Sequence, residues 1–147
     1  MQFLLSHFIG ARVQRIERLQ YIYEHESDPL QDDLQLWLDG NVVRLRAGSD
    51  GERLDVEVTA WDDPFPEPLD PRNAAYVASH GRFVLLDVSA HDDYAQLSGA
   101  RLLGYEPRCL PSGKVTGMTL FFETATLHAF VEFDQLEVSW SAPRPGS

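Results

Sequence analysis

The sequence predicts an α+β fold made mainly of antiparallel β-strands, and three observations support that prediction. Short segments that alternate apolar and polar residues recur along the 147-residue chain, separated by glycine-containing turns. A segment with clear helix-start and helix-stop residues lies near the middle, and an apolar, strand-like segment follows it. The alternating patterns on either side of this connection resemble each other. We therefore expect two pseudo-repeated three-stranded meanders, over about 9–58 and 98–140, joined by a helix over about 71–80 and a strand over about 83–89.

The spacing of apolar residues at the beginning of the first meander fits either a helix or a strand. Residues 2–8 predict a short helical turn, and the apolar residues of 9–23 follow helical spacing. However, the pattern Φ-x-Gly-Ala-Arg-Φ, in which Φ is apolar, occurs there and again over 97–102, where Pro107 soon follows. Proline excludes a helix interior because it removes a backbone donor and clashes with the preceding turn. If the two segments are copies, both are strands, so we predict a strand over residues 11–24.

Three short strands complete the first meander. Leu34–Leu38 alternates cleanly, and the turn residues 39–41 separate it from a strand over 42–46. A second turn, over 48–51, precedes a strand over 54–58. These short connections predict antiparallel neighbours.

The last two of these strands also predict how they pair. Their apolar side chains are expected to face the core: Val43, Leu45, Leu54, Val56 and Val58. Their charged side chains would then share the solvent face, with Arg44 opposite Glu57 and Arg46 opposite Asp55. Such cross-strand ion pairs contribute about 0.2–1 kcal/mol each.

The second half repeats the first. Segments 118–123, 126–133 and 136–140 correspond to the three short strands above, which predicts an internal duplication. We expect six or seven strands in a single domain over 1–140. The polar, proline-rich end of the chain predicts a disordered tail over 141–147.

The connection between the halves is well marked. Asp70 suits a helix N-cap, Pro71 the first helical position and Gly81 the C-cap. The helix has a narrow apolar face made of Ala74, Val77 and Ala78, and we expect it to cover one face or one open end of the sheets. The strand over 83–89 is apolar on both sides except at Asp87, so we expect it to be buried.

The charge of −11 is concentrated in one part of the chain. Residues 24–70 hold fourteen of the 23 acidic residues against three arginines, so this segment alone carries −11 and the remainder sums to zero. Those acids are Glu24, Glu26, Asp28, Asp32, Asp33, Asp39, Asp50, Glu52, Asp55, Glu57, Asp62, Asp63, Glu67 and Asp70. Such a field disfavours nucleic acid and anionic membranes as partners and favours a basic protein. Solubility alone is the alternative explanation.

Compartment signals are few. Cys109 is the single cysteine, and the first residues show neither a basic signal-peptide start nor a membrane-length apolar run. We therefore expect a cytoplasmic protein.

Candidate chemistry is sparse. His91, Asp92 and Asp93 adjoin in sequence, but a metal site needs three or four converging ligands, so a polar turn is the simpler interpretation. Asp87 within an apolar strand could be a general base with a raised pKa, or a paired or exposed carboxylate. Cys109 has no recognisable base partner, and no phosphate-binding glycine motif occurs. We expect no catalytic residue, metal site or cofactor.

The least ordinary segment is 61–68, Trp-Asp-Asp-Pro-Phe-Pro-Glu-Pro. Its three prolines stiffen the backbone and keep it out of a helix or a central strand. A rigid loop with two aromatic rings among carboxylates suits protein binding, because a preordered loop loses little entropy on association. Alternatively, Trp61 and Phe65 fill the core where the chain leaves the meander, and both descriptions can hold together.

On these features the chain resembles the small acidic bacterial proteins found among toxin-neutralising immunity proteins. The resemblance rests on its size, its charge, the Φ-x-Gly-Ala-Arg-Φ opening and the Trp-x-Asp-Pro-Phe loop. It implies a stoichiometric protein inhibitor rather than an enzyme, with a basic antibacterial toxin or effector as partner.

Residue patterns and resemblance together predict a non-enzymatic module that binds a basic protein through an acidic surface. The predicted partner-binding residues are Asp50, Glu52, Asp55, Glu57, Trp61, Asp62, Asp63, Phe65 and Glu67. Two alternatives stay open. One is a hydrolase that uses Asp87 with a histidine between the two halves. The other is a small-molecule or carbohydrate binder that uses exposed Trp37, Trp61 and Trp140.

Overall fold

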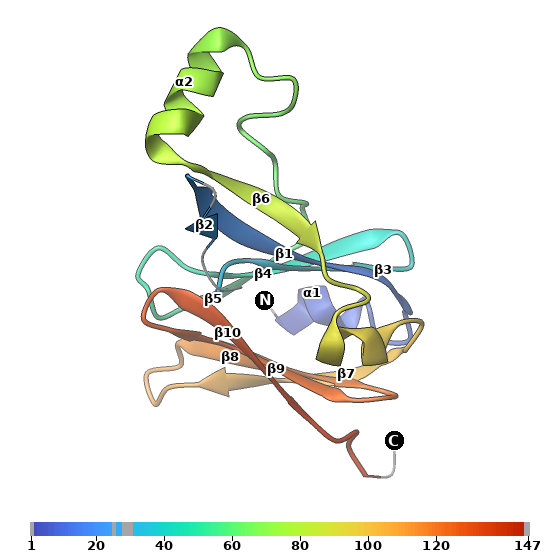
Figure 1. Cartoon of the computed structure of the whole chain (residues 1–147). Helices are drawn as coiled ribbons and strands as arrows, with labels where there is room; N and C mark the ends of the chain where they lie inside the picture. The colour runs from blue at the N-terminus through green and yellow to red at the C-terminus, as the bar shows by residue number, and fades with distance from the viewer. Residues whose placement is uncertain (1, 25, 28–30, 146–147) are drawn as a thin grey trace.

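The computed structural model of the chain describes residues 2–24, 26–27 and 31–145, and it consists of two antiparallel sheets packed face to face (Figure 1). The first sheet contains β1 (Val13–Tyr23), β2 (Glu26–Ser27), β3 (Leu34–Leu38), β4 (Asn41–Ala47), β5 (Leu54–Glu57) and β6 (Arg82–Asp87). The second sheet contains β7 (Leu102–Cys109), β8 (Val115–Phe122), β9 (Thr126–Glu132) and β10 (Gln135–Ser141). The helices are α1 (Gln2–Ser6), α2 (Pro71–His80) and the 3₁₀ turn η1 (Asp92–Leu97).

The predicted fold class is confirmed: the structure is α+β with mainly antiparallel strands. The two sheets share one strand order, since β1-β3-β4-β5 in the first corresponds to β7-β8-β9-β10 in the second. The expected number of six or seven strands is too low, because the described residues form ten. The additional ones include β2, a short strand beside the end of β1. The opening strands β1 and β7 also make each meander four-stranded rather than three-stranded.

The two Gly-Ala-Arg segments lie side by side and join the sheets. Arg12 and Arg101 form an antiparallel bridge. On one side the Gly10 amide donates to the Leu102 carbonyl at 2.7 Å, and on the other the Val13 amide donates to Ala100 at 2.9 Å. The two segments thus occupy equivalent positions in the two sheets. This equivalence agrees with the predicted duplication, which stays a prediction.

A single apolar core fills the space between the sheets. Its fully buried side chains come from both halves of the chain, among them Leu34, Leu36, Leu45, Leu120 and Phe122. Burying one such side chain contributes about 1.5–3 kcal/mol. Since each sheet provides the apolar cover of the other, neither meander has a separate core.

One large charged side chain lies inside this core. Arg18 on β1 is only 1% exposed. Its guanidinium donates to the Leu136 carbonyl of β10 at 2.9 Å, to the Asp32 carbonyl at 2.7 Å and to the Tyr94 hydroxyl at 2.8 Å. Arg18 therefore links the two sheets through hydrogen bonds, a role that its place in an alternating pattern did not indicate.

The predicted pairing of β4 and β5 is confirmed, with Arg44 opposite Glu57 and Arg46 opposite Asp55. Two details of the prediction are wrong. Val58 is 46% exposed because β5 ends one residue earlier, so it does not face the core. Arg44 is only 9% exposed because Asp33 and Glu57 enclose its guanidinium.

The helix of the connection has its predicted bounds, and the strand after it covers Arg82–Asp87 rather than 83–89, but the expected burial of both is wrong. Asp70 caps α2 by accepting a hydrogen bond from the Asn73 amide at 2.7 Å, as predicted. However, no residue of α2 is buried, and the helix projects beyond the start of β6, with its last residue, His80, accepting a hydrogen bond from Tyr21 of β1 (Figure 1). β6 pairs only with β1, at an edge of the first sheet, so much of it is part-exposed and Asp87 is exposed.

The end of the chain is partly ordered by contacts. Ser141, the first residue of the predicted tail, belongs to β10, and the Arg144 guanidinium lies 4.1 Å from the centre of the Phe121 ring. Residues 146–147 of that predicted tail lie outside the described part of the chain, as does Asp28 of the acidic segment.

Candidate functional site

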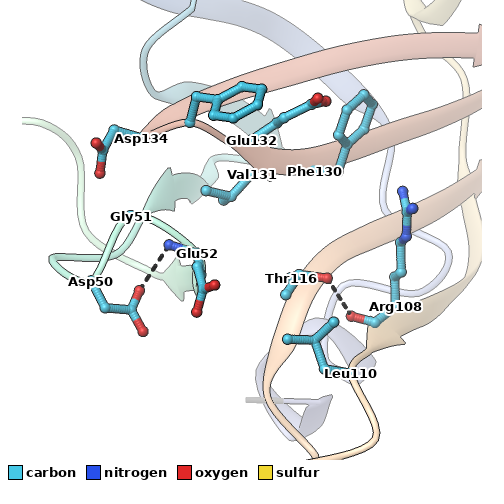
Figure 2. Close-up of a pocket in the computed structure, with 11 residues that line it drawn as sticks. Asp50, Gly51, Glu52, Arg108, Leu110, Thr116, Phe130, Val131, Glu132 and Asp134 are labelled. Atoms are coloured by element: carbon cyan, nitrogen blue, oxygen red, sulfur yellow. Dashed lines mark hydrogen bonds between the residues drawn. The ribbon is translucent and has the colours of Figure 1, made fainter.

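An open groove of about 550 Å³ lies at one end of the two sheets, where three loops meet (Figure 2). The β4–β5 loop forms one wall with Asp50, Gly51 and Glu52. The end of β7 and the start of β8 form the opposite wall, and the β9–β10 hairpin completes the groove. Residues of both predicted meanders therefore contribute to one surface.

The β4–β5 loop is held by the Asp50 carboxylate. Its Oδ1 accepts hydrogen bonds from the backbone amides of Glu52, at 3.0 Å, and Arg53, at 2.8 Å. These amides, together with the nearby Lys114 ammonium, hold the pKa of Asp50 well below its usual range. Lys114, in the β7–β8 loop, lies 3.1 Å from Asp50 and 2.8 Å from Glu52. One cation thus fastens two walls of the groove together.

The β9–β10 hairpin turns through Phe133 and Asp134, whose φ angles are 51° and 66°. Two successive positive φ values define the type I′ turn that suits a two-residue hairpin. The Asp134 amide donates to the Gly51 carbonyl at 3.3 Å, and a Cβ at Gly51 would overlap the Asp134 carboxylate. Gly51 also has a φ of 74°, a conformation that favours glycine, and its contact with Asp134 places the hairpin against the β4–β5 loop.

The groove combines apolar walls with an acidic rim. Leu110, Phe130 and Val131 provide apolar lining, and the Phe133 side chain is 86% exposed. Four carboxylates border the groove, those of Asp50, Glu52, Glu132 and Asp134. The cations nearby are Lys114 and Arg108, whose guanidinium lies 5.8 Å from the centre of the Phe130 ring.

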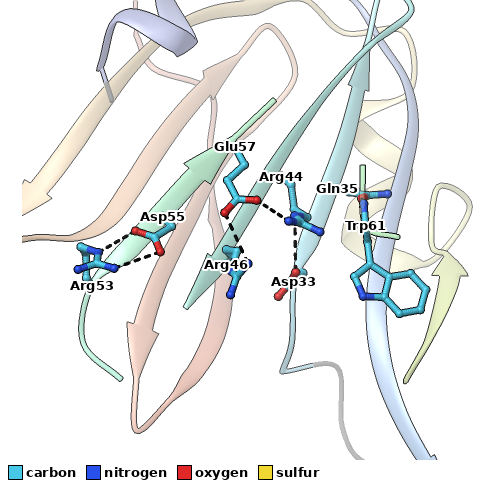
Figure 3. A network of polar contacts seen from close by, with 8 residues as sticks. All are labelled: Asp33, Gln35, Arg44, Arg46, Arg53, Asp55, Glu57 and Trp61. Carbon is cyan, nitrogen blue, oxygen red and sulfur yellow. Dashed lines mark hydrogen bonds and ion pairs between the residues drawn. The ribbon is translucent and has the colours of Figure 1, made fainter. Parts of the chain in front are cut away.

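Only two of the nine predicted partner-binding residues, Asp50 and Glu52, lie at this groove. Asp55 and Glu57 lie on β5, on the face of the first sheet opposite the core (Figure 3). Asp55 pairs with Arg53 at 2.7 Å, and Glu57 pairs with Arg44 and with Arg46, the latter at 3.5 Å.

Asp33 is a largely buried carboxyl beside the ion pairs of β4 and β5. Asp33 lies 3.8 Å from Arg44 (Figure 3), and burial raises the pKa of its carboxyl although Arg44 and Arg46 act in the opposite direction. The Arg46–Asp55 contact expected from the strand pairing is replaced, because Arg46 reaches diagonally to Glu57.

The remaining five predicted residues belong to the segment 58–70, which we call the strap. The strap runs from β5 to α2 over the outer face of the first sheet, where the Trp61 amide donates to the buried side chain of Gln35 on β3 (Figure 3). Arg82 of β6 then holds the strap, donating to Glu67 at 2.9 Å, to Asp63 at 3.2 Å and to the Phe65 carbonyl at 2.6 Å.

The strap also carries an aromatic stack. Phe65 stacks on Tyr76 of α2 with ring centres 5.2 Å apart, and Tyr76 stacks on His80 at 4.3 Å. Trp61 and Phe65 are part-buried and neither belongs to the apolar core. The alternative that these rings fill the core is therefore not what the structure shows.

The structure thus separates the predicted surface into three places. Six of its seven carboxylates make ion pairs within the chain, and Asp62 is exposed without one among the described residues. The alternating pattern predicts Phe133 as the last residue of a strand over 126–133, so it does not indicate an exposed turn with a ring between two acids. The signal that could have indicated this turn is the short gap, Phe133 and Asp134, between two segments of alternating residues.

The chemical alternatives find little support in the geometry. Asp87 is exposed, and hydrogen bonds from Ser89 lower the pKa of its carboxyl, the opposite of what a general base needs. His128 contacts the Thr119 hydroxyl at 3.1 Å and the Ser141 hydroxyl at 2.9 Å. Within the described residues this imidazole has no hydrogen bond to a carboxylate, the group that orients a catalytic histidine in hydrolases.

The three tryptophans do not form a common binding platform. Trp37 donates to Glu17 at 2.5 Å with Arg15 above its ring, whereas Trp140 packs edge-on against Tyr94. Trp61 lies on the strap, and all three rings are only part-buried. Residues 2–24, 26–27 and 31–145 contain no cluster of three or more potential metal ligands.

Comparisons with protein-family models, curated protein sequences and solved structures find no significant match to this chain. In the described part of the chain, no helix is long and apolar enough to cross a membrane.

Proposed function

We propose that this protein is a non-enzymatic binding module of the cytoplasm that neutralises a basic protein, an antibacterial toxin or effector, by forming a stoichiometric complex. The observation that carries the proposal is the groove, where an exposed aromatic ring and apolar walls lie within a rim of four carboxylates. Residues 24–70, which carry the whole net charge of −11, add to the same preference for a basic partner.

Electrostatics supports a basic partner. An acidic surface attracts a basic protein over a distance and speeds its association, while like-charged proteins are repelled. Asp50 and Glu52 share one lysine, so this side of the rim keeps a negative charge. Glu132 and Asp134 have no ion pair among the described residues. The groove therefore keeps unneutralised carboxylates for a partner.

The contacts between loops support binding without rearrangement. The Lys114 bridge and the Asp134–Gly51 hydrogen bond connect the three loops before any partner arrives. A preordered surface loses less conformational entropy on association. Asp55, Glu57, Asp63 and Glu67 also make internal ion pairs, but they do not border the apolar walls of the groove, so we assign the main contact to the groove.

The proposal is tested by affinity capture of the tagged protein from a lysate of its native host, at low and at high salt, with identification by mass spectrometry. We expect one basic protein in a stoichiometric amount, weakened at high salt because salt screens charge pairs. That protein, expressed alone, should arrest growth, and coexpression of the chain should restore growth. A captured protein that is harmless to the cell, or the absence of a basic partner under conditions that express toxins, would overturn the proposal.

Charge variants connect the complex to the groove. Glu52→Gln combined with Glu132→Gln removes two rim charges while leaving the loop-forming Asp50 intact. The matched control is Asp39→Asn combined with Asp93→Asn, which changes the net charge equally in the β3–β4 turn and in η1. We expect slower association with the captured partner for the first pair only, measured by surface plasmon resonance. An equal effect of both pairs would show that the net charge of the protein, and not the groove, determines the rate of association.

A further inference from the structure

We infer that the groove binds one segment of the partner that carries an apolar side chain next to arginine or lysine, with the Phe133 ring as its closing wall. This inference rests on the proposed function and assigns the chemistry that the groove recognises. It is carried by the conformation of Phe133, by the composition of the walls and by the charge of the rim.

The placement of Phe133 is unfavourable for the isolated protein. A side chain other than glycine in the left-handed region costs about 1–2 kcal/mol, and a ring exposed to 86% returns almost no apolar burial. The same protein builds the corresponding β3–β4 turn from Asp39 and Gly40, with φ angles of 48° and 83°. Asp-Gly is a favoured pair for this turn, whereas phenylalanine is not. Folding therefore does not account for an aromatic residue at this position.

The walls near Phe133 suit an apolar side chain. Leu110, on the β7–β8 side, is 42% exposed, and Phe130 and Val131 line the groove between. A volume of about 550 Å³ lies within the range of protein pockets that enclose small ligands or side chains. Aromatic residues in such settings dominate the free energy of protein association. An aliphatic or aromatic side chain of the partner would thus be held between Leu110 and Phe133.

The rim selects the neighbours of that side chain. Glu132 and Asp134 flank Phe133 in the chain, and Asp50 and Glu52 lie on the adjoining loop. Among the described residues, the cations near these four carboxylates are Lys114, which the two loop acids share, Arg108, which lies over Phe130, and Arg53, whose guanidinium pairs with Asp55. Charge complementarity therefore favours arginine or lysine beside the apolar residue and disfavours an acidic segment.

The test uses a phage-displayed library of random linear peptides, selected on the immobilised full-length protein. The inference expects enriched peptides in which arginine or lysine adjoins leucine, methionine or an aromatic residue. One enriched sequence is then synthesised, and its affinity is measured by isothermal titration calorimetry. Enrichment of acidic or uncharged peptides, or no enrichment at all, would overturn the inference.

Phe133→Asn is the decisive variant, because asparagine tolerates positive φ and preserves the turn while it removes the ring. We expect this variant to weaken the selected peptide by at least about tenfold, the loss typical of a central aromatic contact. The matched control is Phe83→Asn, which removes a part-exposed ring from β6, at the edge of the first sheet, and should leave the affinity unchanged. An unchanged affinity in Phe133→Asn would also overturn the inference.

The two proposals fail separately. If the partner captured from the host binds Phe133→Asn as tightly as the unaltered protein, the neutralising function stands and the role of the groove does not. If basic, apolar peptides occupy the groove but the captured partner is harmless, the groove chemistry stands and neutralisation does not.

Discussion

The guanidinium of Arg18 performs a structural task that is usually left to apolar side chains. It lies between the sheets and donates to two backbone carbonyls and one hydroxyl, belonging to segments far apart in the chain. A buried polar atom that loses its partner costs about 1–3 kcal/mol. Removing the guanidinium therefore affects more than one segment at once.

We predict that Arg18→Met lowers the free energy of unfolding by about 3 kcal/mol, because methionine fills similar space but leaves those acceptors unpaired. Urea denaturation followed by circular dichroism measures this change. Arg72→Met, at an exposed position of α2, is the control and should change stability by less than about 0.5 kcal/mol. Equal stability of the two variants would show that water or another donor replaces Arg18.

At the scale of single elements, β4, β5 and Asp33, the residue before β3, form a charged cluster on the outer face of the first sheet. Arg44 lies between Asp33 and Glu57, and Asp33 is the member whose ionised form the fold disfavours. Burial raises the pKa of Asp33 above its unfolded value. The folded state therefore prefers the protonated carboxyl, and ionised Asp33 lowers stability once the pH rises through the folded pKa.

We predict that the stability of Asp33→Asn, relative to the unaltered protein, increases as the pH rises from the unfolded pKa of about 3.8 through the folded pKa, and stays constant above it. Below the unfolded pKa both proteins carry a neutral group there, so the difference should be smallest in acid. Urea midpoints measured at a series of pH values give this difference directly. A relative stability that falls with pH would mean that attraction to Arg44 outweighs the effect of burial.

The strap is an element without regular structure, and Arg82 makes most of the polar contacts that hold its segment 63–67. Arg82 donates to two carboxylates and one carbonyl of the strap, whereas the strap contributes none of its apolar residues to the buried core. Segments with few buried apolar contacts open with low free energies. The attachment at Arg82 should therefore decide how readily the strap opens.

We predict that Arg82→Met accelerates amide hydrogen exchange over residues 61–67 by about tenfold or more, since charge-assisted hydrogen bonds contribute about 1.5–3 kcal/mol. Mass spectrometry of peptic fragments locates the change. Exchange in β9 and β10 should stay the same, because those strands do not contact Arg82. Acceleration spread equally over both sheets would instead indicate general destabilisation.

At the scale of the whole molecule, the Gly-Ala-Arg segments form a seam between the sheets. Gly10 and Gly99 there have φ angles of 91° and 74°, and a Cβ at either would meet no atom within 4 Å. Any effect of adding a methyl group would therefore come from backbone conformation and not from a clash.

We predict that Gly10→Ala and Gly99→Ala each lower the free energy of unfolding by about 1–2 kcal/mol, the usual cost of the left-handed region for alanine. Gly104→Ala is the control, since a Cβ there makes only ordinary contacts. Thermal unfolding should remain a single transition in every variant, because both sheets share one core. Two separate transitions would show that the halves fold independently.

Much of the backbone could be predicted from the sequence. The bounds of α2 and β3, the pairing of β4 with β5 and the correspondence of the two meanders all follow from alternation, caps and turn residues. These features depend on residues that are close together in the chain, so a short stretch of sequence is enough to predict them. The burial of α2 and β6 was mispredicted because apolar composition does not reveal whether an element lies at an edge.

The candidate site was predictable only in part. Asp50 and Glu52 were chosen for their charge and do border the groove. The same criterion selects Asp63 and Glu67, but both lie on the strap, where they pair with Arg82 away from the groove. Phe133 was overlooked because a pattern of alternating residues does not distinguish the last residue of a strand from the first residue of a turn.

The sequence by itself determined the α+β class, the order of the strands along the chain, the helix with its caps and the net charge. Only the tertiary structure decided which charges remain free, because Lys114 reaches Glu52 across 62 positions of sequence and Arg82 reaches Asp63 across 19. It also decided that three separate loops form one groove and that an arginine lies in the core. Periodic patterns report whether a strand is half-buried, whereas ion pairs and grooves depend on distances between loops, which no local pattern encodes.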